Sequence, residues 1–460
     1  MVSPRVKHLW WRAGFGVPLN SGQFTSEKEL LRFLIHDAGD VRPLNTVVEM
    51  ERPADFLRMT PDEKATAVRK KSEVLRQLNA DWFSRLVSNQ GVLREKMTLF
   101  WANHFSCRSG SAEFTIQLNN IIRKNAIGDF KMLLLEVSKS PAMLQFLNNQ
   151  QNRKAHPNEN FAREVMELFT LGRGAYSEQD IREAARAFTG WSFDPSGNFV
   201  FRERVHDAGE KTILGVTGYH NGEDVIRILL QQTRTARFIV EKFWKCFVSD
   251  VPDKQRVDQL AEDFYKSDYN ILSLIRNVFD APWFYEPAYM GELIKSPVEL
   301  MVPLMRDFKV RFENNNVLLG MQKVLGQVLF NPPNVAGWPG GRSWIDSSSL
   351  AIRMRTPSVL IKDEMPEFES KDDGDANNPF GGNNGKGNLK TVADWSLCFG
   401  KWDTIEQQEI LNEIANWLLA KPLTTDQLRL AEKYIKRDSR DEQIRSTIMF
   451  LTALPEYQLC

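Results

Sequence analysis

Apolar side chains recur at helical spacing along most of this chain. In the stretch LREKMTLFWANHF, Leu93, Met97, Phe100 and His104 stand at i, i+4, i+7 and i+11, which places them on one face of a helix. Near the start of KSPVELMVPLMRDF, Ser296, Pro297 and Glu299 have the spacing of a capped helix N-terminus. These patterns predict a mainly α-helical fold, built as one large multi-helix domain.

One segment breaks the helical pattern. In GWSFDPSGNFVFRERVHD, apolar and polar side chains alternate on either side of an Asp194–Gly197 turn. The alternation predicts a small β-hairpin insertion near residues 190–215, with KTILG as a short third strand. This β element ends by presenting His206 and Asp207.

The 460 residues divide into three parts by composition. We expect a main helical domain over residues 1–363 and a flexible Gly/Asn/Asp-rich loop over residues 364–390. That loop holds few apolar residues, so it cannot bury enough surface to offset its ordering entropy. Residues 391–460 are amphipathic, and since about 70 residues make only a marginal core, these C-terminal helices should dock on the main domain.

The charge balance argues against several kinds of partner. The chain has 59 Lys+Arg and 59 Asp+Glu, whereas a dedicated nucleic-acid binder normally has a basic excess. We therefore expect no nucleic-acid partner. No apolar run of about 18 residues is present, so no membrane span is expected. A small-molecule or glycan ligand fits this composition, and a protein partner is left unknown.

Cysteine usage and the N-terminal stretch bear on the compartment. The four cysteines are widely spaced and form no C-x-x-C pair, which suits neither a zinc site nor a disulfide framework. The opening MVSPRVKHLWWRAGFG has basic residues but no apolar segment after them, so it does not resemble a signal peptide. We expect a cytoplasmic protein, unless a leader has been removed.

The stretch HPNENFAREVMELFTLG concentrates charge on a predicted helix over residues 159–171. Asn160, Arg163, Glu164 and Glu167 share one face of that helix. The face has two interpretations. The i, i+4 ion pairs Glu159–Arg163 and Arg163–Glu167, worth ~0.2–0.5 kcal/mol each, suit a solvated surface. Alternatively, the carboxylates line a pocket, where they can accept or transfer protons.

Amide side chains crowd the segment upstream of that helix. Asn149 and Asn152 offer both donors and acceptors, which suit a polyhydroxylated ligand or a hard cation such as calcium. No EF-hand loop is present, and the histidines lack metal-ligand spacing. His104 fits a buried stripe better than a metal site. We assign no metal, and the cofactor is left unknown.

Two other groups are candidates for a site. His206 beside Asp207 at a strand end can act as a general base or ligand, or can merely stabilise a turn. The irregular segment NPPNVAGWPGGRSWIDSSSL presents Trp338 and Arg342. It is either a structural clamp over the core or a pocket wall, in which Arg342 binds an anionic group and a Trp stacks on a ring.

Seven segments carry a resemblance to a known family, namely HLWWRAGFG, REKMTLFWANHF, NENFAREVMELFTLG, YSEQDIREAARAFTGW, HDAGEKTILG, LIKSPVEL and NPPNVAGWPGGRSWI. In this order they resemble the motifs of the bacterial family called domain of unknown function 1800. The resemblance implies membership but no mechanism, because the family has no established biochemical role. Many relatives look exported, which makes a periplasmic location the alternative. Many also carry His where this chain has Phe169, and this departure weakens a metal-site interpretation.

The first function hypothesis is a hydrolase acting on a polyhydroxylated, glycan-like substrate. Paired carboxylates whose surroundings push their pKa values apart are the usual means for such chemistry. The alternative is a non-catalytic scaffold that holds a glycan or a partner chain in the same polar groove. The catalytic candidates are Glu164, Glu167, His206 and Asp207, and the substrate-binding candidates are Asn149, Asn152, Asn160, Arg163, Trp338 and Arg342.

Overall fold

The computed structural model describes residues 2–22, 24–45, 59–362 and 391–460. Helices make up most of this structure, which confirms the mainly α-helical prediction. The first helices are α1 (Pro4–Ala13), α2 (Glu27–Asp37), α4 (Pro61–Val87), α5 (Val92–His104), α6 (Ala112–Asn125), α7 (Phe130–Lys139) and α8 (Pro141–Phe146).

The middle of the chain adds α9 (Glu159–Glu164), the π-helix η2 (Val165–Thr170), α10 (Glu178–Ala187), α11 (Gly222–Leu230), α12 (Thr233–Phe247), α13 (Lys254–Lys266) and α14 (Ile271–Phe279). The last helices are α15 (Pro297–Asp307), α16 (Asn315–Leu325), α17 (Ser347–Ile361), α18 (Ser396–Trp402), α19 (Ile410–Leu418), α20 (Thr425–Tyr434) and α21 (Arg440–Thr452). Single 3-10 turns are η1 (Asn149–Gln151), η3 (Glu203–Val205), η4 (Pro282–Tyr285), η5 (Gly341–Trp344) and η6 (Pro455–Gln458).

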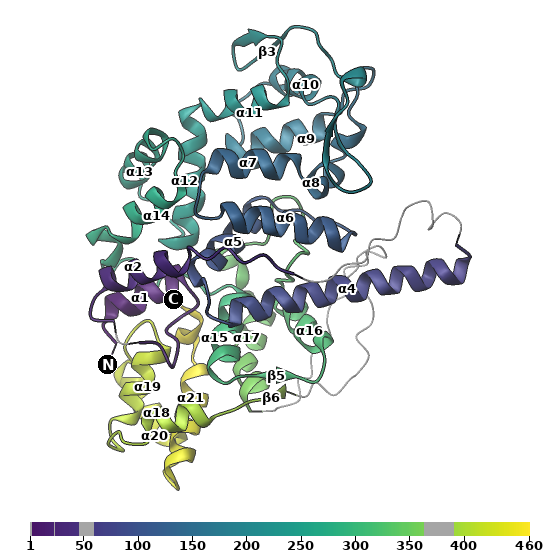
Figure 1. Ribbon diagram of the computed structural model, residues 1–460. Helices are drawn as coiled ribbons and strands as arrows, with labels where there is room; N and C mark the ends of the chain where they lie inside the picture. The colour runs from purple at the N-terminus through teal and green to yellow at the C-terminus, as the bar shows by residue number, and fades with distance from the viewer. Residues whose placement is uncertain (1, 23, 46–58, 363–390) are drawn as a thin grey trace.

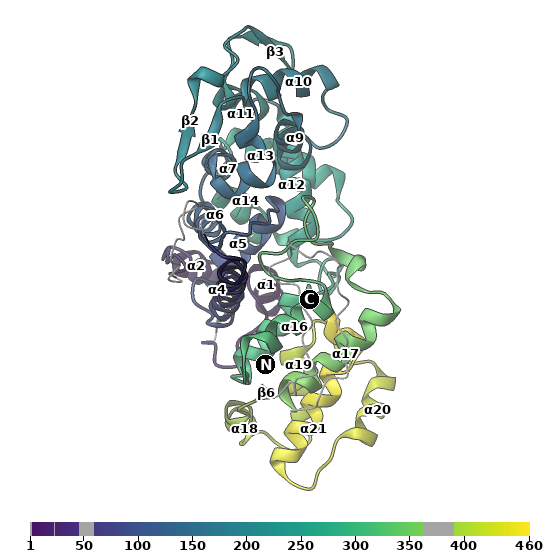
Figure 2. The ribbon, with the colours of Figure 1, turned by 90° about the vertical axis from the view of Figure 1, so that its right-hand side faces the viewer.

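The chain begins at mid-height with α1 and α2, runs to the top of the molecule and returns to the bottom (Figure 1). Figures 1 and 2 show α9, α10 and α11 at the top, α5 and α6 in the middle, and α18 to α21 at the bottom. α4 projects to the right in Figure 1. α5 lies between the upper and lower parts, so its two ends and its faces meet different neighbours.

Local sequence signals explain where several helices begin. Ser296 and Glu299 form a reciprocal capping box at the start of α15, with Pro297 at its first position. Ser177 and Asp180 do the same for α10. Each box satisfies backbone N–H groups that have no partner within the helix.

Two antiparallel hairpins interrupt the helices. β1 (Trp191–Phe193) pairs with β2 (Phe199–Phe201), and β3 (Lys211–Ile213) pairs with β4 (Val216–Gly218). The first hairpin confirms the predicted insertion. The third strand expected at KTILG instead begins a second, separate hairpin. Another two-stranded pair, β5 (Arg311–Phe312) with β6 (Thr391–Val392), joins distant parts of the chain.

The C-terminal helices contact the N-terminal part of the chain. Trp417 Nε1 donates to the carbonyl oxygen of Val17 at 2.9 Å, and Lys7 Nζ donates to that of Leu419 at 2.8 Å. Trp10 and Trp417 belong to the same buried cluster of apolar side chains. The division into a main domain and docked helices stays a prediction, and the loop expected at 364–390 lies outside the described residues.

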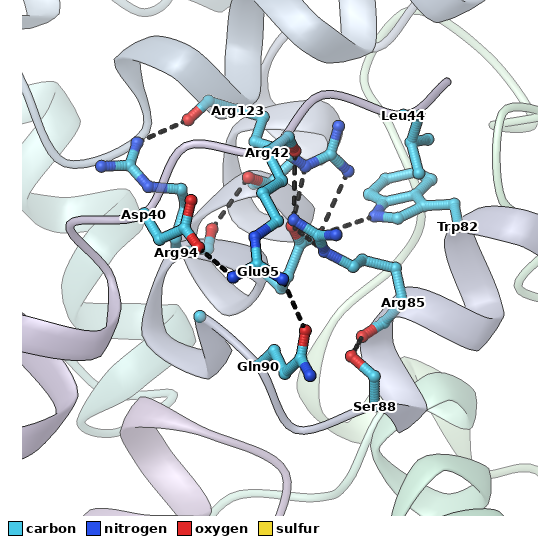
Figure 3. Close-up of polar contacts among 12 residues, drawn as sticks. Asp40, Arg42, Leu44, Trp82, Arg85, Ser88, Gln90, Arg94, Glu95 and Arg123 are labelled. Atoms are coloured by element: carbon cyan, nitrogen blue, oxygen red, sulfur yellow. Dashed lines mark hydrogen bonds and ion pairs between the residues drawn. The ribbon is translucent and has the colours of Figure 1, made fainter. Parts of the chain in front are cut away.

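A buried ion cluster fixes one side of α5 (Figure 3). Glu95, 2% exposed, accepts from Arg123 Nε at 2.7 Å and Nη2 at 3.1 Å. It also accepts from Trp82 Nε1 at 3.2 Å, and Arg85 Nε lies 3.6 Å away. The cluster ties α5 to α4 and α6.

No helix in the described part of the chain combines the length and apolar character needed to cross a membrane.

Candidate functional site

The polar stretch at 159–171 is not one regular helix. α9 ends at Glu164 and continues as the π-helix η2, with the Thr170 hydroxyl donating to the Val165 carbonyl at 2.7 Å. π-helical turns occur often at functional sites, because they redirect backbone carbonyl groups. Two carbonyls of this turn, those of Leu168 and Phe169, accept hydrogen bonds from Lys242 and His104.

Arg163 belongs to an ion-pair network at the surface. Its side chain is 34% exposed and bonds Glu159 at 3.1 Å and Glu178 at 2.8 Å. The i, i+4 pair with Glu159 is the one expected from the sequence. The expected pair between Arg163 and Glu167 is replaced, because Glu167 bonds Arg173 at 2.6 Å and Tyr176 Oη at 2.7 Å.

The two glutamates differ in protonation behaviour. Hydrogen bonds from Tyr176 and Arg173 lower the pKa of Glu167. Burial, with a smaller contribution from the charge of Glu167, raises the pKa of the half-buried Glu164. The pair therefore has the divergent pKa values typical of an acid and a base.

The three asparagines hold backbone segments together. Asn149 Nδ2 donates to the carbonyls of Phe188 and Trp191, at 3.3 and 3.4 Å. Asn152 donates to Ala185 and accepts from the backbone N–H of Asn158. Both side chains are buried. Asn160 is exposed and donates to the Leu147 carbonyl at 3.2 Å.

His206 and Asp207 anchor the loop after the first hairpin. His206 Nδ1 lies 2.9 Å from the carbonyl oxygen of Thr189, to which it donates, and its ring packs on Phe201. Asp207 accepts from Arg186 Nε at 2.7 Å, and this contact holds the pKa of Asp207 at about 2. No hydrogen bond or ion pair in the described residues joins either side chain to Glu164 or Glu167, so their shared catalytic role stays a prediction.

Trp338 is buried and lies at a cavity of about 250 Å³ in the middle of the molecule. Arg342 is exposed, although the neighbouring Gly341 lines the same cavity. The lining comes from α1, α5, α12, α15 and the segment 336–344, which are separate in the sequence. Its members are Trp11, Arg12, Lys96, Leu99, Phe100, Asn103, His104, Lys242, Lys245, Cys246, Asp250, Leu293, Ile294, Ser296, Glu299, Gln327, Ala336, Trp338, Pro339, Gly340, Gly341, Trp344 and Cys460.

Glycine allows the segment 336–344 to approach this cavity. Gly337 has φ +95°, and a Cβ there would lie 2.3 Å from Asn103 Oδ1. That oxygen accepts from the backbone N–H of Trp338 at 2.7 Å. Gly341, at φ +53°, packs in the same way against the carboxylate of Asp250. The two glycines thus let the backbone wall the cavity against α5 and the end of α12.

The cavity wall carries more positive than negative side chains. The cationic side chains are Arg12, Lys96, Lys242 and Lys245, and the carboxylates are Glu299 and Asp250. Lys96 forms an ion pair with Glu299 and donates to the Gly14 carbonyl at 2.8 Å. With this pair neutralised, three cations and one carboxylate remain.

Arg12 is a buried cation with spare donors. Its Nη2 donates to the Tyr289 carbonyl at 2.7 Å, while buried Nε and Nη1 find no hydrogen-bond partner in the described part of the chain. Burial lowers the pKa of Arg12. A buried guanidinium with unused donors adds positive potential to the cavity.

His104 and Lys242 meet at the wall formed by α5 and α12. His104 Nε2 lies 3.2 Å from the Phe169 carbonyl, which can only accept, so Nε2 carries the proton. The unprotonated Nδ1 accepts from Lys242 Nζ at 3.2 Å, and the Leu168 carbonyl accepts from the same Nζ at 3.1 Å. Both carbonyls belong to the π-helix η2. Burial, followed by the charge of Lys242, lowers the pKa of His104 well below its usual value.

Sequence reasoning missed most of this cavity. Lys242 sits in TARFIVEKFWKCFV, an apolar stretch that indicates a buried helix and gives no sign of a partner 138 residues away. Arg12 and Lys96 stand inside two of the segments that carry the family resemblance. Charged residues within strongly apolar, motif-like stretches were the available signal.

No cluster of three or more His, Cys, Asp or Glu side chains suited to a metal ion is found among the described residues. The buried Phe169 ring lies 6.1 Å from the His104 ring, centroid to centroid. Cys246 lines the cavity as a free thiol.

Comparison with protein-family models matches residues 8–459 to the family described as Protein of unknown function (DUF1800). No curated protein and no solved structure matches the chain.

Proposed function

We propose that this chain, which belongs to the DUF1800 family of proteins of unknown function, binds a small organic anion in the central cavity. The observation that carries this proposal is the charge of the wall. A chain with equal numbers of basic and acidic residues gathers four cationic side chains and two carboxylates around one cavity. Cations that line a half-open cleft with low-dielectric walls attract anions more strongly than isolated surface charges do.

The remaining lining supports a ligand that also has an apolar body. Trp11, Phe100, Trp338 and Trp344 contribute aromatic surface. A volume of about 250 Å³ lies just below the usual range for ligand pockets, which favours a small molecule. Asn103 and Gln327 add polar groups that can orient it.

The location of the cavity supports the same proposal. Four of the seven segments that carry the family resemblance contribute side chains to its wall: HLWWRAGFG, REKMTLFWANHF, LIKSPVEL and NPPNVAGWPGGRSWI. A fifth, NENFAREVMELFTLG, contributes the Leu168 and Phe169 carbonyls that hold Lys242 and His104. The polar stretch thus takes part through its backbone.

The test is a binding screen of small carboxylic acids, each paired with its neutral amide, by thermal shift and calorimetry. We expect acids to bind at least about tenfold more tightly than their amides, since one charge contact in a buried site is worth about 1.5–3 kcal/mol. The Lys242→Gln/Lys245→Gln double variant should lose that preference. Lys266→Gln, at an exposed lysine on α13, is the matched control. Equal binding of each acid and its amide would contradict the proposed anion site.

A second candidate is hydrolysis of a glycan-like substrate by Glu164 and Glu167. It is supported by their divergent pKa values, raised for Glu164 and lowered for Glu167. Glu164 accepts no hydrogen bond within the described part of the chain, so it is available to a substrate. Chromogenic glycosides test this candidate. Turnover should be lost in both Glu164→Gln and Glu167→Gln, and turnover that survives both substitutions would exclude it. Glycan binding without turnover in the wild type would favour the scaffold alternative.

A further inference from the structure

We propose that Lys242 forms an imine with a carbonyl group of the bound anion, so that the ligand is a small keto acid or aldehyde acid. This inference rests on the proposed anion site and names the class of molecule that it takes.

The hydrogen bonds of Lys242 leave its nucleophilic electron pair free. Nζ donates to His104 Nδ1 at 3.2 Å and to the Leu168 carbonyl at 3.1 Å. A neutral amine has two N–H bonds and one lone pair. His104 Nδ1 and the Leu168 carbonyl together occupy the two N–H bonds. The lone pair is then directed away from these two acceptors. Lys242 and His104 both line the cavity, which is where a carbonyl carbon can approach.

His104 is fixed as an acceptor rather than a donor. Its Nε2–H is held by the Phe169 carbonyl, and burial opposes protonation of the ring. The Leu168 and Phe169 carbonyls come from consecutive residues of the π-helix η2. One irregular turn therefore positions the lysine directly and also sets the tautomer of the histidine beside it.

Burial also prepares the amine for attack. It lowers the pKa of Lys242 to about 8, with a smaller contribution from the charge of Lys245. At pH 7 about one amine in ten is then neutral, against roughly one in a few thousand for an exposed lysine. Desolvation of this kind activates lysines for attack on carbonyl carbon.

The reaction balances without an oxidant or a metal. The neutral amine attacks the carbonyl carbon, a C–N bond forms, and the carbonyl oxygen takes a proton to give a carbinolamine. The C–O bond then breaks, water leaves, and the nitrogen lone pair completes the C=N bond. Overall, the ammonium form of Lys242 and the carbonyl compound give a protonated imine and water, so the charge in the cavity is unchanged.

Lys295 and Lys245 do not offer the same arrangement. Lys295 is fully buried, and burial lowers its pKa to about 7. However, its Nζ lies 3.8 Å from the ring centroids of both Trp11 and Tyr457, donates to the Tyr457 carbonyl and does not line the cavity. Nζ of Lys242 has one ring against it, that of Phe238, at 4.8 Å from the centroid. Lys245 lines the cavity but is exposed, and its charge acts on the pKa of Lys242. The control is therefore Lys266, an exposed lysine on α13 that does not line the cavity.

The test is reductive trapping in the full-length protein with glyoxylate or pyruvate and cyanoborohydride at neutral pH, followed by intact mass and peptide mapping. We expect one predominant adduct per chain, at Lys242, formed at least about tenfold faster than at any surface lysine. Lys266→Met, at an exposed lysine outside the cavity lining, should be trapped at the wild-type rate. Lys242→Arg, which keeps the positive charge, should still bind glyoxylate in the thermal-shift assay but should form no adduct in the cavity.

The outcomes separate this inference from the proposed function. Adducts spread evenly over surface lysines, or unchanged trapping in Lys242→Arg, would overturn the imine. Binding of glyoxylate by the wild type without any trapping would overturn the imine and leave the anion site. Trapping at Lys242 that is equally fast with uncharged glycolaldehyde, together with equal binding of acids and amides, would remove the anion site and leave Lys242 as a nucleophile.

Discussion

The helix α5 carries charged side chains into two different surroundings. Glu95 enters the cluster shown in Figure 3, where Arg123 and Trp82 occupy both of its oxygens. His104, at the far end of the same helix, lines the cavity next to Lys242. Both regions are buried and polar, yet only the second retains open space beside its charged groups.

The difference separates a charge that holds the fold from a charge that can bind a ligand. At Glu95 every partner is supplied by the chain, so removing one leaves a buried charge without compensation. At the cavity, Lys242 and the spare donors of Arg12 are positive groups without a carboxylate of their own. An incoming anion can satisfy these groups, whereas it has no place at Glu95.

The largest effect is expected from Glu95→Gln. The substitution leaves the guanidinium of Arg123 buried opposite a neutral amide, so unfolding free energy should fall by about 3–5 kcal/mol. Urea denaturation measures the loss. Glu136→Gln, at a partly exposed partner of Lys124, is the control and should cost at most about 1 kcal/mol. Equal stability of the two variants would show that the Glu95 cluster does not hold the fold together.

A smaller loss, about 1–3 kcal/mol, is expected from Lys96→Met. Lys96 lines the cavity, but the chain satisfies it through Glu299 and the Gly14 carbonyl, so it should behave as a structural residue. Burial alone would raise the pKa of Glu299, and Lys96 reverses that shift, so that the net pKa is lowered.

The pH dependence of Lys96→Met tests the same point. In the wild type, Glu299 contributes stability at neutral pH that is lost as the pH falls through its lowered pKa. Without Lys96, burial raises that pKa, and the variant gains relative stability as Glu299 takes up a proton. The stability gap between the proteins should narrow from pH 7 to pH 4. A gap that stays constant would show that Lys96 does not control Glu299.

Lys242→Met should change stability at pH 7 by less than about 1 kcal/mol, because removing a desolvated charge offsets two lost hydrogen bonds. The pKa of Lys242 is lowered to about 8 in the folded protein, so the unfolded chain binds more protons between about pH 8 and 10.4. Wild-type stability should therefore rise over that window relative to the variant. Urea midpoints at pH 7 and 9.5 measure this, with Lys266→Met, at an exposed lysine on α13, as the control. The opposite slope would contradict the burial of Lys242.

The smallest effect is expected from Arg163→Ala. Its partners Glu159 and Glu178 are 38% and 64% exposed, so the loss should be at most about 0.5 kcal/mol. Thermal melting beside Arg182→Ala, on the exposed face of α10, provides the comparison. A loss several times larger would show that the polar face of α9 behaves as a buried ion-pair network, and it would support the hydrolase candidate.

Several local features were predicted from the sequence because they depend on neighbours in the chain. The capping box of Ser296 and Glu299 needs only a spacing of three residues, and the turn at Asp194–Gly197 needs only its own side chains. Family membership was also recognised from the order of short segments. The same reasoning left open whether the segment with Trp338 is a structural clamp or a pocket wall, and in the structure Trp338 is buried beside the cavity.

Other features were decided only by tertiary structure. The sequence by itself determined that the stretch from Glu159 is helical and charged, but not that it turns into a π-helix whose carbonyls face His104 and Lys242. Nor did helical spacing indicate that Glu167 would prefer Arg173 and Tyr176 to Arg163. Local hydrogen bonds and apolar periodicity determine secondary structure over a few residues. The partner of a buried charge is determined by which distant helices pack together, and packing brings Lys242 within hydrogen-bonding distance of a residue 138 positions away.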